Sequence, residues 1–118
     1  MSPRGDVERP NEILVCIERI GFAELALADV DASQEPEDFQ LIFDSILYNL
    51  VIIGEAVNSL SDGVQSVNPE IPWKDIVSMR NILAHRYFQV SAKVIKATID
   101  QPLKELAKVC ESELDSFA

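Results

Sequence analysis

The sequence predicts an all-α fold, an antiparallel bundle of four to five helices, and three observations support this class. Apolar residues recur at helical spacing along most of the chain, and no run alternates between apolar and polar residues as a strand would. Short polar links separate the apolar stretches, as in helical bundles. The chain has 118 residues, of which 47% are hydrophobic, so we expect residues 1–118 to form a single domain with one core.

Two long helices account for the first half of the chain. Pro10, a residue tolerated in a first helical turn, marks the expected start of the first helix, which should end within 29–32. A capping and acid-rich segment at 33–38 introduces a long second helix, which the Ser-Asp-Gly sequence at 61–63 should stop. Gly54 lies inside this second helix, and because it lacks a side chain we expect another backbone to approach it closely.

Prolines divide the second half of the chain. The segment 68–72 contains two prolines, which remove backbone donors and restrict the residues before them, so a helix cannot continue through it. A new helix should begin at about Trp73 and end near His85. Ser91 can cap the last helix, which Pro102 should kink or split.

Charge is distributed unevenly along the chain. Ten Lys and Arg residues against twenty Asp and Glu residues give a net charge of -10, which argues against a broad basic surface for nucleic acid. Within 74–96, however, five basic residues accompany one acidic residue. This segment predicts a local phosphate-binding patch, although a solvated helix face would have the same composition. The RNA-binding candidates are Lys74, Arg86, Lys93 and Lys96.

Cysteine usage and hydropathy predict in which cellular compartment the protein is found. Cys16 and Cys110 lie far apart in apolar surroundings and match no metal-ligand spacing, so we expect reduced core residues, no metal and no cofactor. The apolar run Leu50–Ile53 is much shorter than the ~20 residues of a membrane span. Residues 1–10 lack the apolar segment of a signal peptide. We therefore expect a cytoplasmic protein without a membrane segment.

Polar and titratable side chains gather in the segment 78–88. His85 is the only histidine, and an imidazole can both accept and donate a proton near neutral pH. Arg80 carries a permanent charge that suits phosphate oxygens and the negative charge that develops when a phosphodiester is attacked. Asn81 can orient the reacting groups by a hydrogen bond. Together these residues predict metal-independent RNA cleavage through the 2′-hydroxyl. A histidine that caps a helix end and an arginine paired with a nearby acid would explain the same residues without catalysis.

Helix geometry separates the two charged members of this set. On an ideal α-helix Asn81 and His85 share a face, whereas Arg80 and His85 point ~140° apart. They can meet if the last turn unwinds before Tyr87, if the Arg80 side chain curls round the helix, or if a second copy supplies the missing partner. A chain with one histidine must also provide both an acid and a base. These arguments favour a homodimer with the site at its twofold axis.

Three segments carry a resemblance to a known family. Arg80–Tyr87 fits the pattern R-x4-H-x-Y, and Asn49–Ala56 and Pro69–Trp73 precede it in the expected order. With these motifs the chain, from about Val7 to Leu106, resembles the HEPN superfamily and, within it, the HepT-like toxins. The resemblance implies an all-helical HEPN homodimer that acts as a metal-independent endoribonuclease toxin, with its Arg/His motif at the dimer cleft.

The resemblance also implies roles for individual residues and a partner. Arg80 and His85 would be the catalytic pair, with Asn81 as a supporting polar residue. A cognate MntA-like nucleotidyltransferase antitoxin would neutralise the toxin by AMPylation of Tyr87, which adds negative charge where RNA phosphate enters. Arg86 follows His85 where many relatives place an acid, so we expect this site to be more positive.

Two other functions fit part of the pattern. A non-catalytic HEPN module would bind a nucleotidyltransferase partner or a nucleotide without cutting RNA. A histidine phosphotransfer bundle also presents one histidine on an acidic helical scaffold. However, Arg86, Tyr87 and Phe88 follow His85, instead of a lysine and a glycine spaced to admit a phosphoryl group. RNA cleavage that requires His85 distinguishes the ribonuclease from both alternatives.

Overall fold

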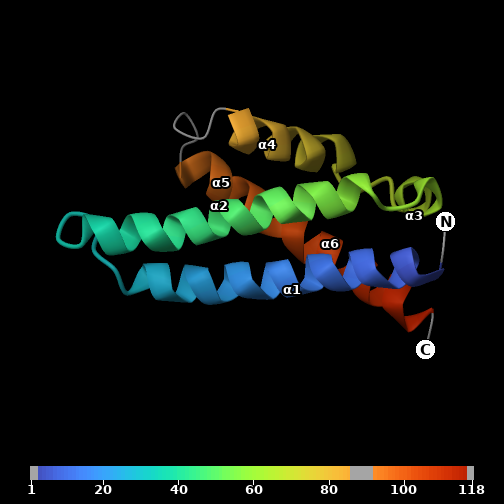
Figure 1. The fold of residues 1–118 in the computed structure, drawn as a ribbon, viewed down its shortest axis with the longest axis horizontal. Coiled ribbons are helices and arrows are strands. Elements are labelled where there is room, and N and C mark those ends of the chain that lie inside the picture. The colour runs from blue at the N-terminus through green and yellow to red at the C-terminus, as the bar shows by residue number, and fades with distance from the viewer. Residues whose placement is uncertain (1–2, 86–91, 117–118) are drawn as a thin grey trace.

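The computed structural model describes residues 3–85 and 92–116, and these residues form six helices and no strand (Figure 1). The helices are α1 (Pro3–Ala28), α2 (Pro36–Asn58), α3 (Asp62–Val67), α4 (Trp73–His85), α5 (Ala92–Ile99) and α6 (Gln101–Asp115). Five of them have eight or more residues, which confirms the predicted all-α class. The six-residue α3 is not among the predicted helices. In Figure 1, α1 and α2 run antiparallel, α4 lies on the other side of α2, and α6 crosses behind.

The predicted start of the first helix is wrong. α1 begins at Pro3, and Pro10 lies inside it. The ring of Pro10 is fully buried, so packing in the core offsets the backbone hydrogen bond that an internal proline removes. The end of α1 at Ala28 lies one residue before the predicted range.

The link between α1 and α2 is held by local hydrogen bonds. The Asp31 carboxylate accepts hydrogen bonds from the backbone N–H of Ser33 at 2.9 Å and from its hydroxyl at 2.7 Å. These bonds lower the pKa of Asp31. α2 then begins with Pro36, and its first turn carries Glu37 and Asp38, whose negative charges favour a helix N-terminus.

α2 is the central helix of the bundle and packs against both α1 and α4. Its buried residues form the middle of the core; they are Ile46, Leu47, Asn49, Leu50, Ile53, Gly54, Ala56 and Val57. By length and composition α2 could also cross a membrane, and among the described helices it alone passes that test. The core helix of a bundle passes the same test, and here the apolar residues of α2 contact other helices.

Gly54 brings α2 and α4 into close contact, which confirms the prediction for this residue. A Cβ atom added at Gly54 would overlap the Cβ of Arg80 and would lie 3.0 Å from its Cγ. It would also lie 3.3 Å from the backbone oxygen of Ile76. A side chain at residue 54 would therefore push α4 away from α2. The close packing of α4 against α2 thus requires a glycine at this position.

The second helix ends earlier than expected, at Asn58, and a short connection follows. Ser61 does not stop α2; its side chain caps α3 by accepting a hydrogen bond from the backbone N–H of Val64 at 3.4 Å. The indole N–H of Trp73 then donates to the carbonyls of Gln65 (3.1 Å) and Asn68 (2.9 Å). These bonds tie the start of α4 to α3.

The end of the chain follows the prediction for Pro102. The last helical stretch is split between Ile99 and Gln101, and Pro102 is the second residue of α6, where its missing N–H removes no helical bond. Ser91, the predicted N-cap, lies outside the described residues.

Both cysteines are buried and free, as predicted. Burial raises the pKa of the Cys16 thiol and raises that of Cys110 to about 12. The thiols are therefore protonated at neutral pH, which keeps them weakly nucleophilic.

Candidate functional site

α4 carries the residues of the predicted site on its exposed face and on one flank. Ile76 and Leu83 are buried and face the core. Away from the core, four exposed polar residues recur at helical spacing and form what we call the outer stripe: Lys74, Ser78, Asn81 and His85. Arg80 lies on the flank between these faces, where α4 meets α2.

The guanidinium of Arg80 is held in the groove between α4 and α2. Its stem packs on Gly54, and one terminal nitrogen donates to Oδ1 of Asn81 at 2.6 Å. The Nε of Arg80 is buried and has no hydrogen-bond partner among the described residues, while 32% of the side chain stays exposed. The buried Nε is therefore out of reach of a ligand and has only the Glu55 carboxylate nearby, at 4.0 Å, whereas the exposed part of the guanidinium can donate to an anionic oxygen.

Glu55 is a member of this site to which the sequence reasoning assigns no role. Its Oε1 lies 4.0 Å from Nε of Arg80, an ion-pair distance that is too long for a hydrogen bond. Glu55 directly follows Gly54, the residue on which Arg80 packs. This adjacency is the signal that identifies it, because the neighbour of a close-contact glycine lies beside whatever packs on that glycine.

The structure joins Arg80 to Asn81 but does not bring Arg80 to His85. α4 is helical through His85, so the last turn does not unwind before this residue. The Arg80 side chain points to Asn81 and Glu55. His85 is exposed at the end of the outer stripe, one turn beyond Asn81.

The RNA-binding candidates lie at two places. Lys74 is exposed at the start of α4, and Lys93 and Lys96 are exposed on α5, beyond the other end of α4. The described lysines therefore do not form one continuous patch. Arg86 and Tyr87 lie outside the described residues.

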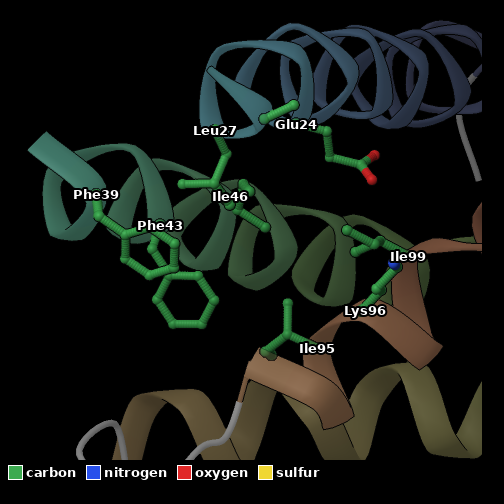
Figure 2. Close-up of a pocket in the computed structure, with 9 residues that line it drawn as sticks. Glu24, Leu27, Phe39, Phe43, Ile46, Ile95, Lys96 and Ile99 are labelled. Atoms are coloured by element: carbon green, nitrogen blue, oxygen red, sulfur yellow. The ribbon is translucent and has the colours of Figure 1, made fainter. Parts of the chain in front are cut away.

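Lys96 lines an apolar hollow of about 340 Å³ between α1, α2 and α5 (Figure 2). Phe39 and Phe43 form one wall with stacked rings, 6.1 Å between centroids, and Glu24 is the other charged residue of the lining. None of Arg80, Asn81 and His85 contributes to this hollow. The hollow is therefore separate from the predicted catalytic residues.

No three His, Cys, Asp or Glu side chains in 3–85 and 92–116 are placed so that they could hold a metal ion together. The polar groups at the site are instead a guanidinium, an amide, an imidazole and a carboxylate. These groups can bind an anion, orient it and transfer protons.

Comparisons with known proteins agree with the motif. The family model described as "Ribonuclease HepT-like" matches residues 16–113. A protein of Caldanaerobacter subterraneus subsp. tengcongensis, provisionally named an RNase, is 37% identical over 75 residues, which are 61% of this chain and 67% of that protein. "Probable ribonuclease HepT" of Thermococcus cleftensis is 34% identical over 62 residues, 52% of this chain and 56% of that protein.

A further relative, from Methanocaldococcus jannaschii and also provisionally named an RNase, is 32% identical over 71 residues, 57% of this chain and 65% of that protein. The chain thus spans between about half and two thirds of the length of these curated relatives. No solved structure matches the chain. The family match begins within α1, extends to Glu113 in α6 and confirms the resemblance derived from the motifs.

Proposed function

Because the chain belongs to the HepT-like ribonuclease family, we propose that it is a metal-independent endoribonuclease toxin that cuts RNA at a dimer cleft. The observation that carries this proposal is the state of Arg80, a half-buried guanidinium with an unpaired Nε–H beside α2. A scissile phosphate can accept hydrogen bonds from the N–H groups on the exposed part of this guanidinium.

The proposed chemistry uses the three predicted residues. A base removes the proton of the RNA 2′-hydroxyl, the 2′-oxygen attacks phosphorus, and the bond to the 5′-oxygen breaks as an acid protonates that oxygen. His85 transfers protons, Arg80 stabilises the additional negative charge on the phosphate, and Asn81 orients Arg80 through the hydrogen bond at 2.6 Å. The products are a 2′,3′-cyclic phosphate and a 5′-hydroxyl.

A homodimer can bring His85 of one copy to Arg80 of the other. The outer face of α2 carries Leu41, Tyr48 and Glu55 at seven-residue intervals, and they are 69%, 65% and (side chain) 60% exposed. Leu41 and Tyr48 are large hydrophobic side chains, and Glu55, the last member of the stripe, forms the ion pair with Arg80. We place the dimer contact on it, because a second copy that covers Leu41 and Tyr48 also reaches the open side of Arg80.

An antitoxin controls the toxin in this proposal. A nucleotidyltransferase of the MntA-like kind transfers AMP to Tyr87, two residues after His85, and the added negative charge and bulk exclude RNA. Residues 1–72 carry three basic and fourteen acidic side chains, an acidic surface for a basic partner. Both partners act in the cytoplasm, where RNA and ATP are available.

RNA cleavage tests the proposal. We expect wild-type protein to cut single-stranded RNA in EDTA and to leave cyclic phosphate ends. Arg80→Ala and His85→Ala should each reduce cleavage by roughly a hundredfold or more. Arg19→Ala, which removes an exposed arginine from α1, is the matched control and should retain activity.

One result rejects the ribonuclease. If folded dimeric wild type cuts none of the RNAs and mass spectrometry finds no AMP on Tyr87, the non-catalytic HEPN module takes its place. In that case binding of a nucleotidyltransferase remains the function to measure.

A further inference from the structure

A second hollow, about 330 Å³ in volume, lies between the end of α2, α3 and the first half of α4. It is within the volume range of small-molecule sites. Its lining residues are Asn58, Gln65, Trp73, Lys74, Val77 and Ser78.

This hollow is adjacent to Arg80 along the groove between α2 and α4. On α4, Val77 precedes Arg80 by one helical turn. On α2, Asn58 follows Gly54 by one turn, and Gly54 is the residue on which Arg80 packs. One turn of a helix rises ~5 Å, so both walls of the hollow continue into the site that holds the guanidinium.

Hydrogen bonds fix the walls of the hollow. The indole N–H of Trp73 donates to two backbone carbonyls, at 2.9 and 3.1 Å, and this fixes the plane of the ring. The side-chain amide of Gln65 donates to the carbonyl of Val57 at 3.2 Å. A rigid aromatic wall is suited to stacking, because the ring loses little freedom when a ligand binds.

The charge of this hollow differs from that of its neighbours. Its lining contains Lys74 and no acidic residue. Each of the four other hollows described contains at least one carboxylate, as expected in a chain with twenty acidic residues. The neighbouring hollow, which shares Gln65, Trp73 and Lys74 with it, also contains Asp62 and Asp75. Among these hollows, the one lined by Asn58 and Ser78 therefore repels a polyanion least.

We propose that this hollow is a nucleoside subsite, which binds the base and ribose of the RNA nucleotide next to the phosphate held by Arg80. The inference rests on the proposed ribonuclease function and adds its substrate contact. Trp73 stacks on the base, Asn58 and Ser78 hydrogen-bond to its edge or to the ribose, and Lys74 attracts the next phosphate. Stacking makes the subsite accept every base, and the polar groups give it a preference among them.

Binding can be measured directly, because Trp73 is the only tryptophan in the chain. Titration with UMP, CMP, AMP and GMP should quench its fluorescence saturably, whereas inorganic phosphate should not. Ser78→Phe adds a ring to the hollow and should weaken the strongest of these responses by roughly tenfold. Ser112→Phe adds the same ring at an exposed serine of α6 and is the control for folding and solubility.

The fluorescence result can overturn the proposal without an activity assay. The hollow is not a nucleoside subsite if none of the four nucleotides changes Trp73 fluorescence beyond the absorbance correction measured with free tryptophan. The same conclusion follows if nucleotides quench the Trp73 fluorescence of Ser78→Phe and of Ser112→Phe with the same affinity.

Cleavage then separates the subsite from the ribonuclease itself. With RNAs that differ in the base beside the cut, Asn58→Leu should flatten the base preference. Lys74→Gln should lower kcat/KM about threefold at low salt and less at high salt, because salt screens the contact with phosphate. The control Lys104→Gln, on α6, should leave kcat/KM unchanged.

Two failures have different meanings. If wild type cuts RNA but Asn58→Leu and Lys74→Gln behave like Lys104→Gln, the subsite is rejected and the ribonuclease stands. If wild type cuts no RNA, the proposed function is rejected, and the Trp73 titration decides nucleotide binding by itself.

Discussion

The two sides of α4 hold the two halves of the predicted catalytic pair, and they are built differently. On the flank facing α2, Arg80 is positioned by Gly54, Glu55 and Asn81 and is half-buried. On the outer stripe, His85 is exposed at the end of the helix. Contacts within one chain thus position the arginine, whereas no contact among the described residues holds the imidazole of His85 beside it. The difference teaches that packing between α2 and α4 positions the guanidinium, and that the proposed homodimer has to bring an imidazole to it.

The largest expected effect comes from mixing two inactive variants. If each site combines Arg80 of one copy with His85 of the other, Arg80→Ala and His85→Ala mixed after unfolding and refolding should regain roughly a quarter of wild-type cleavage. Half of the dimers are then mixed, and each mixed dimer has one intact site. Cleavage that stays at the level of the separate variants would show that both residues act within one chain.

A charge on the outer face of α2 should break the proposed dimer. Tyr48→Asp places a carboxylate in the proposed contact and should raise the dimer dissociation constant by about a hundredfold, since a buried unpaired charge is strongly unfavourable. Analytical ultracentrifugation measures this. Phe22→Asp, at a residue of α1 that is 64% exposed, is the matched control, and a greater loss of dimer there would move the contact to α1.

Gly54 tests how Arg80 is positioned. Gly54→Ala should destabilise the fold by about 1–3 kcal/mol, because the added methyl group overlaps the stem of Arg80. Gly21→Ala should stabilise by about 0.5–1 kcal/mol, since nothing lies within 4 Å of a Cβ there and alanine favours a helix. Urea unfolding of both variants gives the comparison. Equal stability of the two would mean that the contact between α2 and α4 tolerates a side chain.

A pH-dependent effect concerns the core, away from both sides of α4. The pKa of Cys110 is raised from 9.0 to about 12 in the folded protein, so the folded state holds its proton more tightly than the unfolded chain. The stability from this difference is complete below pH 9 and is lost as the pH rises from 9 towards 12. The free energy of unfolding of Cys110→Ala should fall less steeply over this range, and equal slopes would contradict the shift.

Local rules were sufficient for several elements. Two prolines before Trp73 predict the start of α4 correctly, because these signals act within a few residues. The same rules fail at Pro10, where the local penalty is offset by burial in a core built from distant residues. They also miss α3, which has only six residues and whose N-cap, Ser61, belongs to the segment that was expected to stop the preceding helix.

The candidate site shows the same limit. The residue types and their spacing identify Arg80, Asn81 and His85, and the helix angle indicates that Arg80 and His85 diverge. Glu55 is not assigned a role, because its meeting with Arg80 depends on how α2 packs against α4, more than twenty residues apart along the chain.

The sequence by itself determined the helical class, the start of α4, the need for a residue without a side chain at 54 and the family. Periodicity, proline geometry and motif spacing are properties of neighbouring residues. Only the tertiary structure decided that Arg80 lies on Gly54 with its Nε unpaired, and that an acid-free hollow adjoins it. Those features depend on which helices meet and at what distance, and packing between residues far apart in the chain sets both.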